Sequence, residues 1–259
     1  MKKLISRFLG LFDLILEKSV DKKSIISLIQ SLHVFSTDKN LIRLGPDGDG
    51  GYLVPNDLEG IEACFSPGVG NLSGFEKDCL TYGMKVFLAD GSVNAPAGNE
   101  FDFIKKFIGP VSGNGFITLE DWIISKVGES QSDLLLQMDI EGHEYLTLIN
   151  APESLLNRFR IIVVEFHSLQ KLGNGEFFSI VSSVTKKMLK NHTCVHNHPN
   201  NHVAIDNRLG IEIPPLLELT FLRNDRITQK ILQKKFPHPL DSDSTNAPHI
   251  SLPPIWYEK

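Results

Sequence analysis

An apolar run near the middle of this 259-residue chain ends abruptly in acidic residues. The stretch "LLLQMDIEGHEY" (134–145) places Asp139 directly after the run and Glu141 and Glu144 within the next turn. Carboxylates grouped in this way can accept a proton or bind a divalent cation. Acidic residues also complement the positive end of a helix, and for Glu144 this simpler interpretation is preferred. Asp139 is therefore the first candidate for chemistry, with Glu141 beside it as a substrate contact.

A second apolar run, "RIIVVEFH" (160–167), ends in Glu165 and His167. These two side chains alternate along an extended chain, so they point to the same side. A glutamate after four apolar residues is costly to bury without a partner, and a histidine changes its charge near neutral pH. If both runs are neighbouring parallel strands, their carboxyl ends share the sheet edge at which ligands bind. Asp139, Glu165 and His167 then form a candidate catalytic group.

This group permits two ways of activating a hydroxyl. In the first, Asp139 and Glu165 bind a divalent cation, and His167 or His198 serves as a further ligand or as the general base. A set of oxygen ligands suits Mg²⁺, whereas an imidazole ligand favours Mn²⁺ or a later transition metal. In the second, no metal takes part, and His167 acts as the base after a carboxylate has oriented it. The residue types leave both routes open.

A histidine-rich stretch, "HTCVHNHPNNH" (192–202), follows later in the chain. If it is a strand, His196 and His198 share one face. Its spacing does not match a closed tetrahedral zinc site. A polar turn with incidental histidines explains the same letters, so only convergence with the other strand ends would make the stretch functional. On that condition His196, Asn200 and Asn201 are candidate substrate contacts, and His198 is a candidate metal ligand.

Glycines follow an earlier strand-like segment in "SPGVGNLSGFE" (66–76). Gly68 and Gly70 would let the backbone pass close to a ligand at the start of a helix. Asp90 ends the next strand-like segment, where a carboxylate can accept hydrogen bonds from both hydroxyls of a ribose. Ser73 occupies the position of the third glycine in the dinucleotide fingerprint, which disfavours a pyrophosphate. These four residues therefore predict a site for a nucleoside without phosphates, such as S-adenosylmethionine.

Strand-like and helix-like segments alternate along the chain, which predicts a parallel, doubly wound α/β sheet. The expected strands are 61–66, 84–90, 133–139, 160–167, the stretch "TCVHNH" and 216–223, with a less clear strand region around 110–117. The expected helices are one that opens at Ser73, one over 100–109, one that opens after Thr118, one after 140 that breaks at Pro152, and one over 176–191. Ser73 with Glu76, and Thr118 with Asp121, have the spacing of N-terminal capping pairs.

The composition is that of one large domain, with 41% hydrophobic and 22% charged residues. A net charge of -5 and the lack of a long basic block argue against a nucleic-acid partner. Three cysteines without a CxxC pair fit neither a disulfide framework nor a thiolate zinc site. A reducing cytoplasm is therefore the expected compartment.

We divide the chain into an N-terminal helical appendage (1–40) and a main domain (41–259). The opening "MKKLISRFLGLFDLILEK" predicts an amphipathic helix that is too polar to span a bilayer. Docking on the domain or in a homo-oligomer is the simpler role for it, and peripheral contact with a membrane surface is the alternative. The proline content of the tail (236–259) predicts an extended strap.

Several of these stretches together resemble the FkbM-type family of S-adenosylmethionine-dependent methyltransferases. The matching segments are "RLGPDGDGGYLVPNDL", "FSPGVGNLSGFE", "FLADGS", "LEDWI", "LLLQMDIEGHEYLTLINAPESLL", "IIVVEFHSL", "VHNHPNN" and "IPPLLELTFLR", in order within residues 41–225. The resemblance implies a class I methyltransferase fold, with a seven-stranded, mostly parallel sheet whose last strand is antiparallel. It also implies methyl transfer from S-adenosylmethionine, typically to an oxygen, often on a sugar or natural product.

The resemblance carries roles onto matching positions of this chain. Gly68 and Gly70 would line the cofactor loop, Asp90 would hold the ribose, and Asp139 would lie near the reacting methyl group. His143 stands where a small residue is expected. The surroundings of that helix turn are therefore expected to be particular to this protein.

The segment "GPDGDGGY" (45–52) lies before the first core strand. Its glycines could simply make a hairpin turn, which is their commoner use. Because the resemblance includes the segment, Asp49 and Tyr52 are candidates for a lid or acceptor wall over the cofactor.

The combined expectation is an S-adenosylmethionine-dependent O-methyltransferase that acts on a hydroxyl of a sugar, glycan or natural product. A divalent cation, Mg²⁺ or Mn²⁺, is an optional second cofactor. An NAD-dependent oxidoreductase and a metal-dependent hydrolase are the alternatives. A binding module without catalysis is least favoured, because it leaves the polar groups at the strand ends unexplained.

Overall fold

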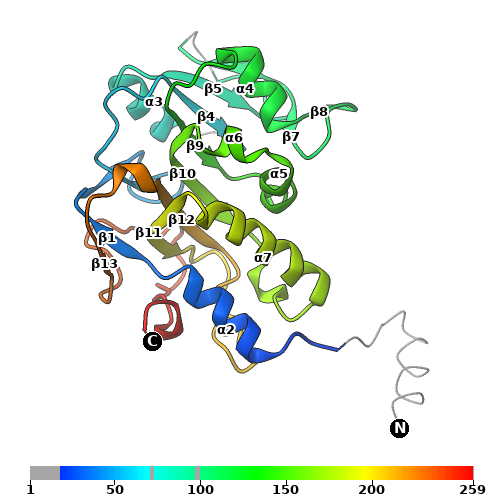
Figure 1. The fold of residues 1–259 in the computed structure, drawn as a ribbon, viewed down its shortest axis with the longest axis vertical. Helices are drawn as coiled ribbons and strands as arrows, with labels where there is room; N and C mark the ends of the chain where they lie inside the picture. The colour runs from blue at the N-terminus through cyan, green and yellow to red at the C-terminus, as the bar shows by residue number, and fades with distance from the viewer. Residues whose placement is uncertain (1–17, 71–72, 97–99, 259) are drawn as a thin grey trace.

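The computed structural model describes residues 18–70, 73–96 and 100–258 of the chain. A seven-stranded sheet forms its centre, with the strands in the order β11-β12-β10-β9-β4-β5-β6, and Figure 1 shows it running along the molecule. The strands are β4 (Ala63–Pro67), β5 (Lys85–Ala89), β6 (Asp102–Ile104), β9 (Leu134–Met138), β10 (Phe159–Phe166), β11 (His192–Pro199) and β12 (Leu217–Arg223).

The sheet is parallel except for one strand. β12 runs antiparallel to both of its neighbours, β10 and β11, whereas β10, β9, β4, β5 and β6 are parallel to one another. This confirms the prediction of a seven-stranded, mostly parallel sheet with an antiparallel last strand. Every residue of β9 and β10 is buried, as expected for apolar strands that are covered on both faces. The carboxyl ends of the parallel strands meet at one edge.

Helices cover one face of the sheet. They are α2 (Lys22–Ser31), α4 (Leu119–Val127), α5 (Glu144–Asn150), α6 (Glu153–Leu156) and α7 (Gly175–Leu189), and short 3-10 turns are η1 (Leu169–Lys171), η2 (Asn224–Arg226) and η3 (Pro254–Trp256). The larger core cluster joins α2, α4, α5 and α7 to sheet residues such as Phe65 and Val164. Helix α2 contributes Ile25 and Ile29, so the start of the chain's described part belongs to this core.

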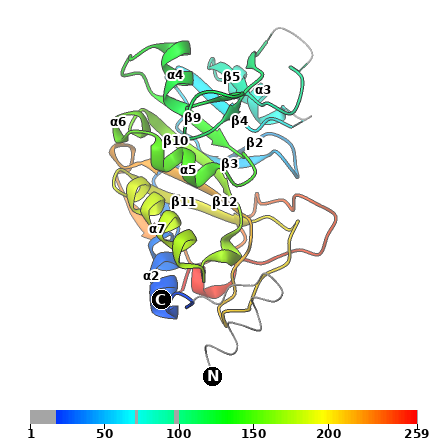
Figure 2. The ribbon, with the colours of Figure 1, turned by 90° about the vertical axis from the view of Figure 1, so that its right-hand side faces the viewer.

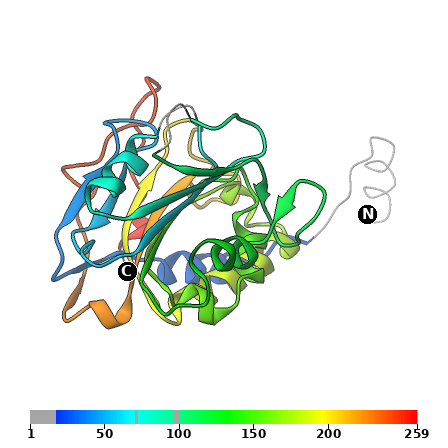
Figure 3. The same ribbon diagram turned by 90° about the horizontal axis from the view of Figure 1, so that it is seen from above.

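The opposite face carries a mixed layer. Its parts are α3 (Gly74–Thr81) and a hairpin of β2 (Leu41–Leu44) and β3 (Tyr52–Pro55), and Figure 3 shows them on the side away from the helices. Phe75 and Val54 pack there against Cys64 and Val163 of the sheet. The loop between β2 and β3 reaches the sheet edge at which the parallel strands end.

Two further small pairings lie outside the large sheet. β1 (Phe35–Thr37) pairs with β13 (Lys230–Leu232), and β7 (Phe107–Ile108) pairs with β8 (Phe116–Ile117). The first joins segments that are almost two hundred residues apart in the sequence, as Figure 1 shows. The tail beyond β13 is extended apart from η3 and packs Trp256 into the core, where its indole N–H donates to the carbonyl of Glu212. Figure 2 shows this tail folded back against the body of the molecule.

Two local predictions are wrong. The expected helix over 100–109 is replaced by β6 and β7. Phe103 packs toward one core cluster and Ile104 toward the other, so the apolar residues follow the two-residue repeat of a strand. Of the expected strand around 110–117, only Phe116 and Ile117 are extended as β8. The expected strand "TCVHNH" is confirmed, because it lies within β11, and the alternative of a polar turn does not hold for these residues.

Of the two predicted capping pairs, one is confirmed. The Thr118 side chain accepts a hydrogen bond from the Asp121 amide at 3.1 Å and caps α4. Ser73 precedes α3 but its side chain makes no capping bond, and Glu76 turns into the interior instead. The amphipathic helix expected in the first 17 residues lies outside the described residues. Within the described ranges, none of the helices has the length and apolar character needed to cross a membrane.

Candidate functional site

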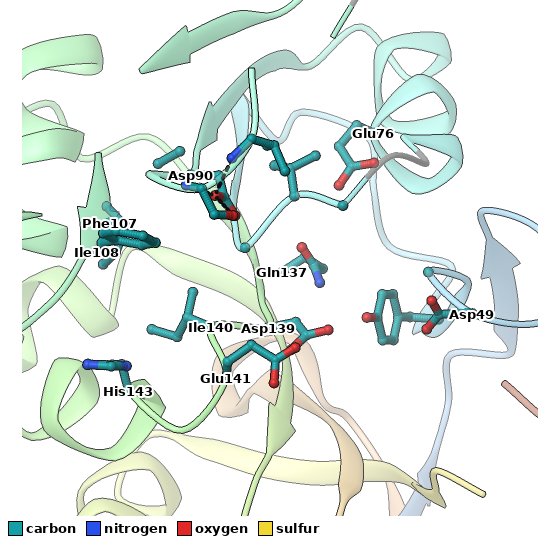
Figure 4. A pocket seen from close by; sticks show the side chains of 18 of the residues that line it. Asp49, Glu76, Asp90, Phe107, Ile108, Gln137, Asp139, Ile140, Glu141 and His143 are labelled. Carbon is teal, nitrogen blue, oxygen red and sulfur yellow. Dashed lines mark hydrogen bonds between the residues drawn. The ribbon is translucent and has the colours of Figure 1, made fainter. Parts of the chain in front are cut away.

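A cavity of ≈ 610 Å³ opens at the carboxyl ends of β4, β5 and β9. Figure 4 shows its two ends: Phe107, Ile108 and His143 on one side, and Gln137, Asp139 and Asp49 on the other. The lining residues are Asp49, Gly50, Tyr52, Gly68, Val69, Gly70, Glu76, Ala89, Asp90, Ser92, Val93, Phe107, Ile108, Phe116, Gln137, Asp139, Ile140, Glu141 and His143. Its size lies in the range of about 300–1,000 Å³ that small-molecule sites occupy.

Gly68 fits closely against the tip of the neighbouring strand. It has φ +88, and a Cβ built on it would lie 1.4 Å from the carbonyl oxygen of Asp139. Only glycine allows this backbone approach. Gly70 also lines the cavity, but a Cβ there would meet nothing within 4 Å. Of the two predicted loop glycines, Gly68 is thus the one that positions Asp139.

Asp90 lies at the cavity wall directly after β5. Its Oδ1 accepts hydrogen bonds from the Ser92 amide and hydroxyl, both at 2.6 Å, and from the Val93 amide at 3.2 Å. Its Oδ2 accepts none from the part of the chain that the structure describes, so it can face a ligand. Ser73, predicted to contact the same ligand, is not among the described residues of the wall.

A buried network stands deeper in the cavity. The Ser66 hydroxyl lies 2.6 Å from Oε1 of Glu76 and 2.6 Å from Oε1 of Gln137. One hydroxyl can donate to only one of these two oxygens, and burial raises the pKa of Glu76. None of these three residues was predicted from the sequence to belong to the site. Only their burial beside one another marks them.

The predicted catalytic group is assembled around His167. Its Nε2 lies 3.8 Å from Oδ1 of Asp139 and 3.6 Å from Oε1 of Glu165. Glu141 is 3.4 Å from the same nitrogen but is mostly exposed to solvent. On the other side of the ring, Nδ1 lies 3.1 Å from Oε1 of Glu144. The structure therefore brings Asp139, Glu165 and His167 together as the sequence predicted.

Glu144 has a larger part than a charge at a helix end. It is fully buried, and its Oε1 accepts hydrogen bonds from the amides of Ile140 and Gly142 at 3.1 and 3.0 Å. Positive φ angles at Glu141 (55) and Gly142 (97) fold the loop around this carboxylate. Its contact with His167 was absent from the sequence interpretation, because it depends on how α5 docks beside β10.

The carboxylates of this group crowd one another. Burial, and then the charge of Glu165, raise the pKa of Asp139 to about 8. Burial and the charge of Glu218 raise the pKa of Glu165 to about 8 as well. Glu218, which was not predicted from the sequence to belong to the site, lies opposite Glu165 on β12. Burial raises the pKa of Glu218 to about 8. If all three carboxylates were ionised, their mutual repulsion in this poorly hydrated site would be unfavourable, and this is why their pKa values are raised.

The same negative charges favour the protonated form of His167. Burial alone would lower its pKa, but the contact with Glu144 and the charges of Glu165 and Asp139 raise it to about 9. An imidazole so placed holds its proton unless another cation takes over the neutralisation of the carboxylates.

Of the contacts predicted from the histidine-rich stretch, some lie in the catalytic group and others lie elsewhere. Asn200 belongs to the group, since its amide donates to Oε2 of Glu165 at 3.2 Å. His198 does not reach Asp139: β11 is three strands from β9 in the sheet, roughly 14 Å at ordinary strand spacing. His196 and His198 instead contact Asp241 of the tail, at 3.0 and 3.5 Å.

Of the other predicted substrate contacts, some line the cavity and one does not. Asn201 fastens the tail, because its amide donates to the carbonyls of Thr245 and Ala247. Asp49 and Tyr52 do line the cavity at its polar end. His143 lies at the apolar end, with its ring 6.0 Å from that of Phe116.

No family model matches the chain, and no curated protein matches it either.

Proposed function

We propose that the protein is an S-adenosylmethionine-dependent O-methyltransferase acting on a hydroxyl of a sugar, glycan or natural product. The observation that carries this proposal is the charge of the cavity. Its wall holds Asp49, Glu76, Asp90, Asp139 and Glu141, and no lysine or arginine occurs among the described lining residues. A cation bound here would favour the charged forms of Asp139 and Glu76, whose pKa values are raised by burial. Such a wall therefore favours a cationic ligand, and the sulfonium of S-adenosylmethionine is a cation.

The arrangement of the wall matches the parts of this donor. The apolar end, with Phe107, Ile108 and Phe116, offers a slot for a base. Oδ2 of Asp90 is placed for ribose hydroxyls, and Asp139 stands at the polar end where the sulfonium would lie. The seven-stranded sheet with its antiparallel last strand agrees with the class I methyltransferase fold that the family resemblance implies.

The same wall argues against NAD as the ligand. A pyrophosphate binds through cations and through a helix that approaches closely over a third glycine. Ser73 stands at that position, and the wall supplies carboxylates. A metal-dependent hydrolase could use Asp139, Glu165 and His167, but it would leave Asp90 at the cavity wall without a purpose.

The reaction needs position more than covalent help. The acceptor oxygen forms a bond to the methyl carbon as the carbon–sulfur bond breaks, and the electron pair of that bond remains on sulfur as a neutral thioether. Aligned reactants make this displacement fast. The hydroxyl proton must also leave, and Asp139 of the cavity wall, with His167 and Glu165 next to it, is the group that would accept it.

Ligand binding tests the proposal before the acceptor is known. S-adenosylhomocysteine is expected to raise the melting temperature of the full chain, and NAD is not. Substitution Asp90→Ala should weaken S-adenosylhomocysteine binding at least tenfold in calorimetry, whereas Asp102→Ala, at the exposed start of β6, should not. Stabilisation by NAD alone would reject the proposal in favour of the oxidoreductase. Transfer of labelled methyl groups to a panel of glycans and polyols then identifies the acceptor.

A further inference from the structure

We propose that Asp139, Glu165 and Nε2 of His167 bind a divalent cation. The two carboxylate oxygens lie 3.8 and 3.6 Å from Nε2. Ligands that share one metal ion at bond lengths of about 2.1–2.3 Å stand roughly 3.0–3.7 Å apart, by the geometry of octahedral and tetrahedral sites. Both carboxylates therefore lie near ligand distance from Nε2, and the Glu165 side chain would have to rotate to join Asp139 around one ion.

The atoms that face this point lack other partners. Oδ1 of Asp139 is buried and has no hydrogen-bond partner. The Glu165 side chain is 6% exposed, and its Oε2 is held by Asn200, while Oε1 accepts no hydrogen bond from the described residues. Buried carboxylate oxygens normally have partners. A bound cation would supply the missing partner to Oδ1 of Asp139.

The shortage of positive side chains around these carboxylates also favours a bound cation. No lysine or arginine within the described ranges forms an ion pair with Asp139, Glu165 or Glu218, and His167 is the only basic partner recorded for the first two. Buried carboxylates at this density are costly unless they are protonated, paired or bound to a metal. A divalent cation would neutralise the group and free His167 from holding a proton.

Glu144 acts behind the imidazole as a positioning residue. The ligand atoms of Asp139, Glu144 and His167 lie within 4.8 Å of one another, but Oε1 of Glu144 is occupied by two backbone amides and faces Nδ1, the ring nitrogen away from Asp139. Nδ1 makes no hydrogen bond to the described residues, but the carboxylate 3.1 Å away would orient the ring with Nε2 toward a metal once it accepts the Nδ1 proton. The next residue, Tyr145, donates its hydroxyl to the His167 carbonyl at 2.8 Å and anchors the backbone.

The ligand set suggests which ion binds and what it does. Two carboxylates with one imidazole suit Mn²⁺ better than Mg²⁺, which prefers oxygen alone. The exposed Glu141 side leaves room for water or an acceptor hydroxyl, whose pKa a bound cation would lower. This role in methyl transfer rests on the proposed function, whereas the ion site can be tested without any substrate.

The test is Mn²⁺ binding to the metal-free full chain, followed by electron paramagnetic resonance. One Mn²⁺ per chain is expected, with hyperfine coupling to a single histidine nitrogen. Glu165→Gln should weaken binding at least tenfold, and Glu144→Gln should weaken it by about 10–100-fold. The control Glu212→Gln, on an exposed side chain, should bind as the wild type does.

Two outcomes would overturn the site, and neither depends on a variant that folds poorly. The first is wild-type protein that binds no Mn²⁺ beyond the level of weak surface contacts. The second is bound Mn²⁺ without nitrogen coupling, which would place it elsewhere. Mn²⁺ binding without S-adenosylhomocysteine binding would instead reject the proposed function and leave the site standing.

Discussion

At the scale of single residues, the candidate site depends on contacts that tolerate almost no change. Gly68 touches the backbone of Asp139, and the Asp139 amide donates to the carbonyl of Pro67 at 3.2 Å. The strand tips of β4 and β9 are thus locked to each other at the point where the ligand edge begins. The side chain of Asp139 receives its direction from this lock, since it has no hydrogen bond of its own on Oδ1.

Gly68→Ala should therefore damage both stability and ligand binding. The new methyl group would collide with the Asp139 carbonyl, and φ +88 is strained for any residue with a Cβ. We expect a loss of about 3 kcal/mol or more in the free energy of unfolding and no measurable S-adenosylhomocysteine binding. Gly70→Ala is the matched control, because a Cβ there meets nothing. Equal chemical-denaturation midpoints for the two variants would contradict the argument.

At the scale of elements, two capping pairs with the same spacing are followed by different helix starts. Thr118 caps α4 in the expected way, whereas Ser73 leaves α3 without a side-chain cap. The two helix starts differ in the surroundings of the acidic residue that lies three positions after the serine or threonine. Asp121 is exposed on α4, but Glu76 is drawn into the cavity wall beside Ser66. Tertiary surroundings therefore overrode a local capping preference at α3.

Two alanine substitutions distinguish these helix starts. Thr118→Ala removes the acceptor for the Asp121 amide and should cost about 1 kcal/mol of unfolding free energy. Ser73→Ala removes no capping bond and should change the unfolding free energy by less than about 0.5 kcal/mol. Urea denaturation of both variants measures the difference. A larger loss for Ser73→Ala would show that its hydroxyl does cap α3 in solution.

At the scale of the whole molecule, segments from both ends of the chain close over the sheet. β1 pairs with β13, and the tail then crosses to β11, where Asp241 contacts His196 and His198. Burial alone would raise the pKa of Asp241, but these two histidines hold it well below its usual range. A carboxylate with a depressed pKa stabilises the folded state above its unfolded pKa of about 3.9, and this contribution is lost as the pH falls.

Asp241→Asn should consequently destabilise the protein in a pH-dependent way. At pH 7 the loss should be about 1.5–3 kcal/mol, the range for hydrogen bonds to a charged group. The gap between wild type and variant should narrow as the pH is lowered below about 4, because the carboxylate then becomes protonated in the unfolded chain while it stays charged in the folded protein. Asp243→Asn, in the same segment but paired only with the exposed His249, should show neither effect. Melting temperatures across pH 3–8 provide the measurement, and a gap of constant size would contradict the assignment.

The sequence alone determined the central strands of the sheet and its ligand edge, although not the edge strand β6. Continuous apolar runs such as 133–139 and 160–167 can only be strands covered on both faces, and their order along the chain predicts parallel pairing. Asp90, Asp139, Glu165 and His167 then had to lie at the carboxyl ends, and they do. These features follow from local periodicity, which is written in neighbouring residues.

Only the tertiary structure decided which polar residues meet. Glu144, Glu218 and Glu76 joined the site, and His198 and Asn201 left it for the tail. Such contacts depend on strand order, on the docking of α5 and on the path of the tail. Each is set by packing between segments far apart in the sequence, and no local pattern of residues encodes it.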